Sequence, residues 1–344
     1  MSEDDTPFFL KQNQGFLEAD ASAELLHPTE NKLVKADSLT ETQYFGFSVP
    51  ESEIHGYAYL WHHPNLHVLT GGLWAWSGIK QYMVQSELCD FRTYMSDSAL
   101  KNDLHDYRLE NGFGVKILEP LKRFHMTYVD AARDNSVDLV YEAVGPAVMF
   151  GDGKHMEQPM RAVGELVLRG HRYRVDCFNV RDRSWGKARP EDNLSMPPAS
   201  WMTGVFSEDF AFNCNIFDQA SGNPELTGRL ALPDERTLAG GWLYRDGKLS
   251  RFVRARKRVV RRPVSLLPDE IEFEATDDLA RRIAVRGTLI ASCPWQAWGN
   301  FNANINLMRW ECEGLVAHGD CQEPLWNDYC NHVAINVKGS DGRQ

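Results

Sequence analysis

Hydrophobic and polar positions alternate over short runs along most of the chain, and turn-forming residues separate the runs at short intervals. Alternation with a period of two places every second side chain on one face of a β-strand. Residues 54–61 follow this pattern, with Tyr57, Tyr59 and Trp61 on one face, and a polar break precedes a second run at 66–70. We therefore expect a β-hairpin here.

Three further segments show two alternating runs around a short turn. One has a turn at residues 169–171 between runs at 165–168 and 173–177, another has an Asp-Gly turn at 246–247, and the last turns at 276–278. An Asp-Gly pair tolerates the positive φ angles of tight hairpin turns. Meanders of such hairpins close into barrels or fold into sandwiches, which hide their sheet edges. The pattern predicts an all-β protein, and we favour barrels.

Three segments depart from this pattern. Residues 78–90 have apolar positions spaced as in a short helix, and residues 1–35 form a polar arm with little core-forming character. Residues 190–198 are polar and contain three prolines, which is typical of a linker. Since 344 residues are enough for two hydrophobic cores, we expect an N-terminal domain over 36–189 and a C-terminal domain over 199–344.

The composition is that of an ordinary globular protein, with 43% hydrophobic and 25% charged residues. No apolar run approaches the roughly 20 residues that a membrane-spanning helix needs. The first five residues are acidic and lack the basic and apolar regions of a secretory signal. We therefore expect a cytoplasmic protein without a transmembrane segment.

The net charge of −11 disfavours binding to nucleic acid. One basic segment, residues 251–262, carries seven lysine and arginine side chains interleaved with valines. The main interpretation is a solvated strand edge that charge protects from aggregation. Peripheral contact with anionic lipid, or binding of an acidic ligand, is the alternative.

The seven cysteines include no Cys-x-x-Cys pair, so we expect reduced thiols rather than a disulfide framework. Several cysteine and histidine residues gather near the C-terminus, but most of their spacings are longer than zinc sites use. We expect buried free thiols, ordinary core histidines and no metal. The residues concerned are Cys312, His318, Cys321, Cys330 and His332.

The chain contains no dinucleotide fingerprint, phosphate-binding loop, metalloprotease motif or nucleophile elbow. We therefore expect no cofactor. The most informative segment is 181–186, which reads Arg-Asp-Arg-Ser-Trp-Gly and ends a predicted strand just before the linker. Its charge, at the end of an apolar strand, predicts a position at a barrel mouth or inside a pocket.

This segment resembles the His-Asp-His-x-Trp-Gly or Arg-Asp-His-Ser-Trp-Gly signature of the AttH-like and carotenoid 1,2-hydratase (hydroxyneurosporene synthase) family. That family also includes kievitone hydratase and the lipocalin-like Diels–Alderases. Supporting matches are the tryptophan-rich early strands, His-Met-Glu-Gln at 155–158 and Pro-Ala-Ser-Trp at 198–201. The resemblance covers most of the chain loosely, and only the short signature is specific.

The resemblance implies two lipocalin-like antiparallel β-barrel domains packed around a hydrophobic cavity. It also implies cofactor-independent chemistry on a bulky apolar molecule of terpenoid, steroid-like or polyketide-like character. The expected reactions are hydration of an alkene, the reverse dehydration, or cyclisation. The oligomeric state is left open, a homodimer included.

A buried carboxylic acid can stay protonated near neutrality, so Asp182 is the candidate acid for protonating a carbon–carbon double bond. Capture of water by the resulting cation needs a base, for which His155 and Glu157 are candidates. Aromatic π faces stabilise a cation. The aromatic residues expected at the ligand are Trp61, Trp74, Trp76, Trp185 and Tyr59.

Two departures from the family pattern bear on this chemistry. Arg183 stands where the signature has histidine after the aspartate, and arginine neither gives nor takes a proton at working pH. Beside Asp182 it would depress the pKa of that acid. Phe-Ala-Phe at 210–212 replaces the Tyr-x-Asp pair of the carotenoid hydratases, and we expect Phe212 and Asn213 to contact the ligand.

Three alternatives stay open at this point. Asp182 with a neighbouring arginine could be a structural ion pair at a strand end. The same pocket could belong to a non-catalytic binding or carrier protein, in which Arg183 would bind a carboxylate or phenolate. A structural or interaction protein is the third alternative.

Overall fold

The computed structural model describes residues 15–27, 39–189, 195–223 and 225–340. Strands make up 64% and helices 9% of the described structure, which confirms the all-β class. The chain divides into two compact units between residues 190 and 191. Of the predicted linker, residues 190–194 lie outside the described residues, as do 1–14 and 28–35 of the predicted arm.

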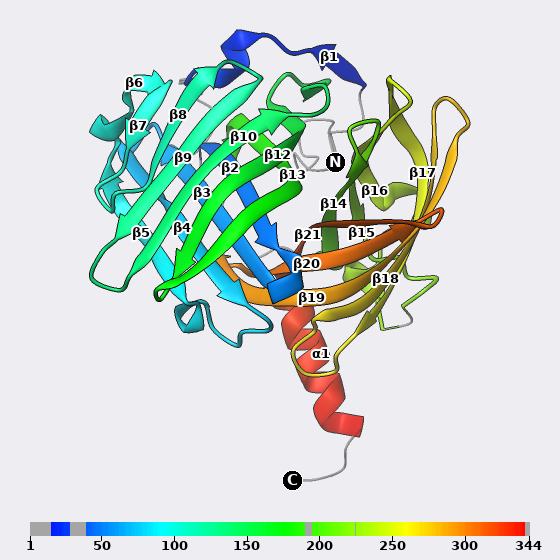
Figure 1. Cartoon of the computed structure of the whole chain (residues 1–344). Coiled ribbons are helices and arrows are strands. Elements are labelled where there is room, and N and C mark those ends of the chain that lie inside the picture. The colour runs from blue at the N-terminus through cyan, green and yellow to red at the C-terminus, as the bar shows by residue number, and fades with distance from the viewer. Residues whose placement is uncertain (1–14, 28–38, 190–194, 224, 341–344) are drawn as a thin grey trace. The chain divides into compact units, whose positions relative to one another are not determined.

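The N-terminal unit is a curled, 12-stranded antiparallel sheet with the order β5-β4-β3-β2-β13-β12-β10-β9-β8-β7 (Figure 1). β11 pairs with β12, and β1 pairs with β11. Most of the inward side chains form one core that includes Phe45, Phe47, Leu60 and Leu73. The strands of this sheet are β1 (Phe16–Glu18), β2 (Leu39–Val49), β3 (Ile54–His63), β4 (Val68–Ser77), β5 (Leu88–Ser96), β7 (Asp106–Arg108), β8 (Gly114–Glu119), β9 (Arg123–Asp130), β10 (Asn135–Ala143), β11 (Val148–Phe150), β12 (His155–Leu168) and β13 (His171–Ala188), and the short strand β6 (Lys101–Leu104) is outside it.

The C-terminal unit is a closed barrel of eight strands in sequential order, completed by pairing between β14 and β21. Its core packs the rings of Phe212, Phe273 and Trp310, with centroids of Phe212 5.7 Å and 6.0 Å from the other two. The predicted barrel is therefore confirmed here. The elements are β14 (Ala199–Ser207), β15 (Phe210–Phe217), β16 (Leu238–Arg245), β17 (Lys248–Arg261), β18 (Pro268–Asp277), β19 (Arg282–Trp298), β20 (Phe301–Cys312), β21 (Leu315–Trp326) and the helix α1 (Asn327–Ser340).

All four predicted hairpins are confirmed, as β3–β4, β12–β13, β16–β17 and β18–β19. Two of them use two-residue loops in which both residues have positive φ. These residues are Arg169 and Gly170 in one loop and Asp246 and Gly247 in the other. This geometry matches the right-handed twist of the strands and fixes their register.

The helix expected over residues 78–90 is wrong. The segment contains one short 3₁₀ turn, Met83–Gln85, and β5 begins at Leu88. Tyr82 and Val84 are 63% and 83% exposed. The apolar side chains at 79–84 are therefore not packed into the core, and helical spacing alone does not stabilise a helix.

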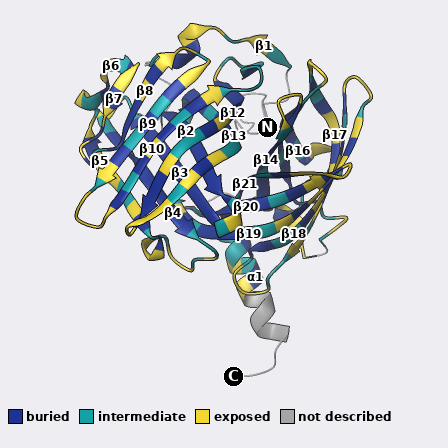
Figure 2. Cartoon of the chain, in the orientation of Figure 1, coloured by how far each residue is buried: buried dark blue, intermediate teal, exposed yellow. Residues whose placement is uncertain are grey.

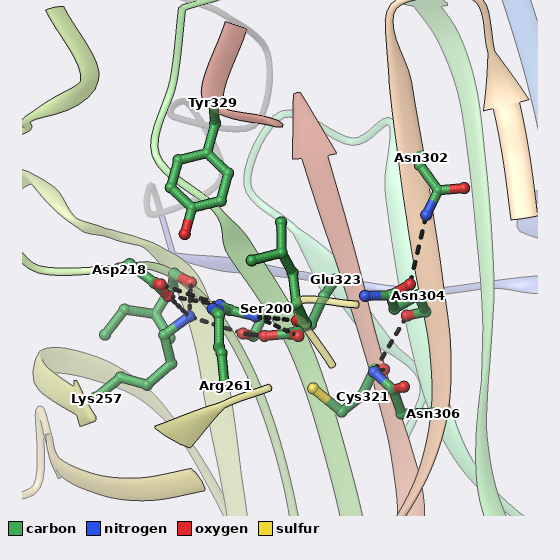
Figure 3. Close-up of polar contacts among 12 residues, drawn as sticks. Ser200, Asp218, Lys257, Arg261, Asn302, Asn304, Asn306, Cys321, Glu323 and Tyr329 are labelled. Carbon is green, nitrogen blue, oxygen red and sulfur yellow. Dashed lines mark hydrogen bonds and ion pairs between the residues drawn. The ribbon is translucent and has the colours of Figure 1, made fainter. Parts of the chain in front are cut away.

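Only Arg251 of the basic segment 251–262 pairs with β16, whereas the rest of the segment pairs with β18 alone among the described strands. The other side of β17 has no described strand partner over this stretch, in agreement with the predicted strand edge. Alternation along β17 sends Lys257 and Arg261 into buried positions, where they meet Asp218 and Glu323 (Figure 3). The other basic side chains of the segment stay largely at the surface. Peripheral membrane contact stays a prediction.

Residues 15–27, the described part of the predicted polar arm, form β1 and a 3₁₀ turn at Ala21–Glu24. Ala23 and Glu24 are buried, so this part of the arm contributes to the packing of the N-terminal unit. The described portions of the chain contain no helix long and apolar enough to cross a bilayer.

Candidate functional site

The signature segment lies near the end of β13, between β12 and β2. Glu157 on β12 lies directly opposite Asp182, and His155 lies opposite Ser184. On the other side, Asp182 lies opposite Tyr44 of β2. Residues directly opposite each other in antiparallel strands share a face. The three predicted catalytic residues are therefore neighbours on one face of the sheet.

His155 and Glu157 form a buried pair on this face. The Nε2 atom of His155 lies 3.0 Å from Oε1 of Glu157, and the two residues are 8% and 1% exposed. The His155 ring also packs against Phe150, with centroids 5.1 Å apart. Asp182 is only partly buried. The arrangement combines a fixed histidine–carboxylate pair with a second, more accessible carboxyl group.

Two hydroxyl groups lie next to Asp182 in the strand register and on the same face. The Oγ1 atom of Thr42 and the Oγ atom of Ser184 are 2.7 Å apart, and Arg189 donates to Ser184 Oγ at 2.8 Å. Burial raises the pKa of Tyr59, with the nearby Asp182 adding to the rise and Arg189 opposing it. Tyr59 therefore keeps its proton and can donate a hydrogen bond.

The same face continues across β2, β3 and β4 as a wall of aromatic rings, which we call the aromatic face. Cross-strand register places every one of these side chains on the face of Asp182. Tyr57 lies at the centre of the wall, with its ring centroid 4.4 Å from Tyr44, 5.7 Å from Tyr59 and 4.5 Å from Trp74. The aromatic face consists of Tyr44, Tyr57, Tyr59, Trp61, Trp74 and Trp76.

Both faces of these strands are buried, and in β2 every residue is buried (Figure 2). Of the residues predicted from the sequence, the structure brings Asp182, His155 and Glu157 together with the aromatic side chains of β3 and β4. The hydrophobic cavity that the resemblance implies stays a prediction.

Arg183 and Trp185 lie on the opposite face of β13, because successive side chains of a strand alternate. Arg183 lies directly opposite Gln43, and its guanidinium is 5.5 Å from the ring of Trp185. Trp185 stacks on His27 with centroids 4.3 Å apart. These two predicted ligand contacts are therefore separated from the aromatic face by the sheet itself.

Phe212 and Asn213 belong to the C-terminal unit and lie on opposite faces of β15. Phe212 points into the barrel core. Asn213 is 1% exposed, and neither atom of its amide has a hydrogen-bond partner among the described residues. The two residues therefore do not line one surface.

The sequence analysis missed the partners of the two arginines. Arg181 contacts Glu24, with Nη2 2.6 Å from Oε1, and its guanidinium also donates to Gln158 at 2.7 Å and 3.0 Å. Arg183 contacts Glu41, with Nη2 3.4 Å from Oε2. Both arginines face away from Asp182, and their carboxylate partners are Glu24 and Glu41.

Glu41 is a buried carboxyl group near the signature whose pKa is strongly shifted. Burial raises its pKa from 4.5 to about 7, although Arg183 and the backbone N–H of His27 lower it. A sequence signal for Glu41 exists: it shares the alternation of Phe45 and Phe47, so a charged side chain occupies a core-facing position.

Replacement of Glu41 with glutamine is expected to change how stability depends on pH. The raised pKa means that the folded chain holds this proton more tightly than the unfolded chain. Wild-type stability therefore falls relative to the variant as the pH rises from 4.5 through about 7. The expected loss is roughly 3 kcal/mol, at about 1.4 kcal/mol per pKa unit. Denaturant unfolding of both proteins across this range measures it.

Asp218 provides a control of opposite sign. Burial alone would raise its pKa, but the positive charges of Arg261 and Lys257 lower the pKa by more than burial raises it. The net shift is therefore downward. Wild type should therefore lose stability relative to Asp218→Asn as the pH falls towards and below the ordinary aspartate range. A Glu41→Gln difference that does not change with pH would contradict the assignment of Glu41.

Within the described residues, no group of three or more histidine, cysteine, aspartate or glutamate side chains is arranged to hold a metal ion. The cysteines, including Cys312, Cys321 and Cys330, are free thiols. The candidate site is thus built from acid–base side chains and aromatic rings.

A family model described as "Domain of unknown function (DUF7064)" matches residues 20–328. No curated protein matches the sequence. Among solved structures, an AttH-like protein from Nitrosomonas europaea is similar, with 10% identity and a TM-score of 0.58 over 87% of this chain and 99% of that one.

Two further similar structures are kievitone hydratase from Nectria haematococca and CghA. Kievitone hydratase is 9% identical, with a TM-score of 0.51 over 92% of this chain and 97% of that one. CghA is 10% identical, with a TM-score of 0.52 over 91% of this chain and 98% of that one. These likenesses confirm, at the level of the fold, the resemblance stated from the sequence.

Proposed function

The chain belongs to the DUF7064 family. We propose that it is a cofactor-independent enzyme that hydrates, dehydrates or cyclises a bulky apolar molecule. One observation carries the proposal. Asp182, Glu157 and His155 adjoin one another at the border of the aromatic face, within a single sheet. Acid–base groups beside a buried aromatic wall suit a reaction that passes through a carbocation.

In the hydration direction, Asp182 in its acid form gives its proton to one alkene carbon, and the other carbon becomes cationic. The rings of Tyr59 and Trp61 stabilise this cation through their π faces. A water molecule adds its oxygen to the cation, and the proton that it loses passes to the His155–Glu157 pair. Return of that proton to Asp182 completes the cycle, and dehydration is the reverse.

Two observations support this assignment. Arg183 replaces the histidine of the family signature and was expected to lower the pKa of Asp182. It faces the other side of the sheet, however, and contacts Glu41. In addition, kievitone hydratase is by name a hydratase, and CghA has been solved with Sch210972, so proteins of this fold include a hydratase and a binder of a small organic molecule. The terpenoid, steroid-like or polyketide-like character of the substrate is part of the proposal.

The test begins with native mass spectrometry of the protein purified from its own host, which identifies a co-purifying small molecule. That compound is then incubated with the protein in water enriched in heavy oxygen. We expect it to gain a labelled water, to lose water, or to change retention at constant mass through cyclisation. A compound that stays bound and unchanged in all three respects would favour a carrier and overturn the enzyme proposal.

A further inference from the structure

The core-facing side of the signature segment carries a second group of polar residues, which we call the Glu41–Arg183 cluster. It consists of Glu41, Gln43 and Arg183, on β2 and β13. Arg183 lies directly opposite Gln43, and all three residues are at most 3% exposed. Tyr107 donates its hydroxyl proton to Oε1 of Gln43 at 2.7 Å. The cluster is therefore deeply buried and held from several strands.

Two donors of this cluster are unused. The amide nitrogen of Gln43 and the Nε of Arg183 are buried and have no hydrogen-bond partner in the described parts of the chain. The other guanidinium nitrogens are engaged, since Nη1 donates to the Leu25 carbonyl at 3.1 Å and Nη2 to Glu41. Buried donors are rarely left unpaired in folded proteins. Because Gln43 and Arg183 lie directly opposite each other on one face, their two donors suit an oxygen that accepts from both.

The C-terminal barrel provides an internal comparison, because it buries a cluster of two cations with two carboxylates (Figure 3). There, Nζ of Lys257 contacts Asp218 at 2.6 Å, Ser200 Oγ at 2.7 Å and the Ile216 carbonyl at 3.1 Å. Arg261 contacts both Asp218 and Glu323. In this second cluster, which we call the Lys257–Arg261 cluster, the Nε of Arg261 is the one buried cation donor without a partner among the described residues.

The two clusters differ in how well their charges are compensated. Burial alone would lower the pKa of Arg261, but Asp218 and Glu323 raise it well above its usual value. In the Glu41–Arg183 cluster burial prevails: it raises the pKa of Glu41 and lowers that of Arg183. The Lys257–Arg261 cluster therefore largely compensates its own charges, whereas the Glu41–Arg183 cluster has charge and donors left over.

We propose that the Glu41–Arg183 cluster is a binding site for the carboxylate of a small organic anion, with Arg183 Nε and the Gln43 amide donating to its oxygens. A guanidinium and an amide in this arrangement form the charge-assisted bonds that carboxylates favour. The stacked Trp185 and His27 beside Arg183 favour an aromatic carboxylate. The site is on the opposite face from the proposed catalytic residues and does not rest on the proposed reaction.

Binding at this site should be linked to protonation of Glu41. An anion beside Glu41 disfavours its ionised form, so the complex takes up protons and its affinity falls as the pH rises above about 7. Other charged or titratable groups surround Glu41 from every neighbouring element. They are Arg181 and Arg183 on β13, Glu24 and His27 on the segment before β2, His62 on β3, Asp103 on β6 and Tyr107 on β7.

The experiment titrates the full chain with benzoate by calorimetry, about one pH unit below and one above the pKa of Glu41. Buffers of different ionisation enthalpy report the protons taken up. We expect saturable binding, proton uptake, and about tenfold weaker affinity at the higher pH. Benzyl alcohol, which keeps the ring but lacks the charge, should bind at least about tenfold more weakly.

The decisive variant is Gln43→Glu, which keeps an acceptor for Tyr107 but replaces the unused donor with a negative charge. It should lose at least about tenfold in benzoate affinity. Ser200→Ala, in the Lys257–Arg261 cluster, is the matched control and should bind as wild type does. Circular dichroism verifies that both variants are folded. Benzoate that binds Gln43→Glu as tightly as wild type, or that shows no saturable binding to wild type, would overturn the proposal.

Discussion

Replacement of Arg261 with methionine is expected to destabilise the C-terminal barrel by about 3–5 kcal/mol, the usual cost of removing one partner from a buried ion pair. Arg261 is held between Asp218 and Glu323, at 3.0 Å and 2.6 Å. Its loss leaves Glu323 buried with the Ser200 hydroxyl, at 2.8 Å, as its only donor among the described side chains. Denaturant unfolding followed by circular dichroism measures the effect.

Arg258 provides the matched control, because it lies on the same strand but pairs with Glu272 at the exposed surface. Arg258→Met should cost at most about 1 kcal/mol, as exposed ion pairs contribute little. The double variant Arg261→Met with Glu323→Gln should recover part of the loss, since the second change removes the unpaired charge. Equal effects of the two methionine variants would show that the buried network does not stabilise the barrel.

The sequence alone could not reveal this network. It shows a run of seven basic residues, and the partners lie far away along the chain, with Asp218 just after β15 and Glu323 in β21. Only closure of the barrel brings them together. The period of two within 251–262 was visible, however, and it places Lys257 and Arg261 on one face. The seven basic residues should therefore have been assigned to two faces of the strand rather than interpreted as a single basic surface.

The hairpins were predictable because their information is local. Arg169-Gly170 and Asp246-Gly247 both adopt positive φ, and a two-residue loop fixes the register of the strands on either side. The loop at 169–170 alone places Glu157 opposite Asp182. The acid–base part of the candidate site therefore follows from the turn and the signature. The pairing of β13 with β2, which adds Tyr44 and the aromatic face, depends on contacts remote in sequence.

The alternation of side chains along β13 also explains why the signature motif was misleading about Arg183. Asp182 and Arg183 are adjacent in the signature, and a strand necessarily sends them to opposite faces. The sequence analysis assigned both to one pocket and expected Arg183 to weaken the acid. The structure separates them and supplies Glu41 as the partner of Arg183. Glu24 could not have been found at all, since it reaches Arg181 from a 3₁₀ turn 157 residues away.

Replacement of Asp182 with asparagine is expected to lower conversion of the native substrate by about a hundredfold to ten-thousandfold, the usual contribution of a positioned acid. Asparagine has nearly the same shape but cannot give up a proton to carbon. Because the aromatic face is unchanged, substrate affinity should stay near that of wild type, so the loss should appear in kcat and not in KM. Single-turnover conversion and a binding titration with the co-purified compound measure the two quantities separately.

Asp176→Asn tests whether the loss is specific to the site. Asp176 lies on the same strand and the same face alternation as Asp182, but it is exposed and pairs with Arg161 at 2.8 Å. Its replacement should leave conversion within about twofold of wild type, because an exposed ion pair contributes little even to stability. If Asp182→Asn kept full conversion while Glu157→Gln lost it, the acid would be Glu157, whose carboxyl group lies directly across the strand pair. Full conversion by both variants would place the chemistry elsewhere and leave the aromatic face with a role in binding alone.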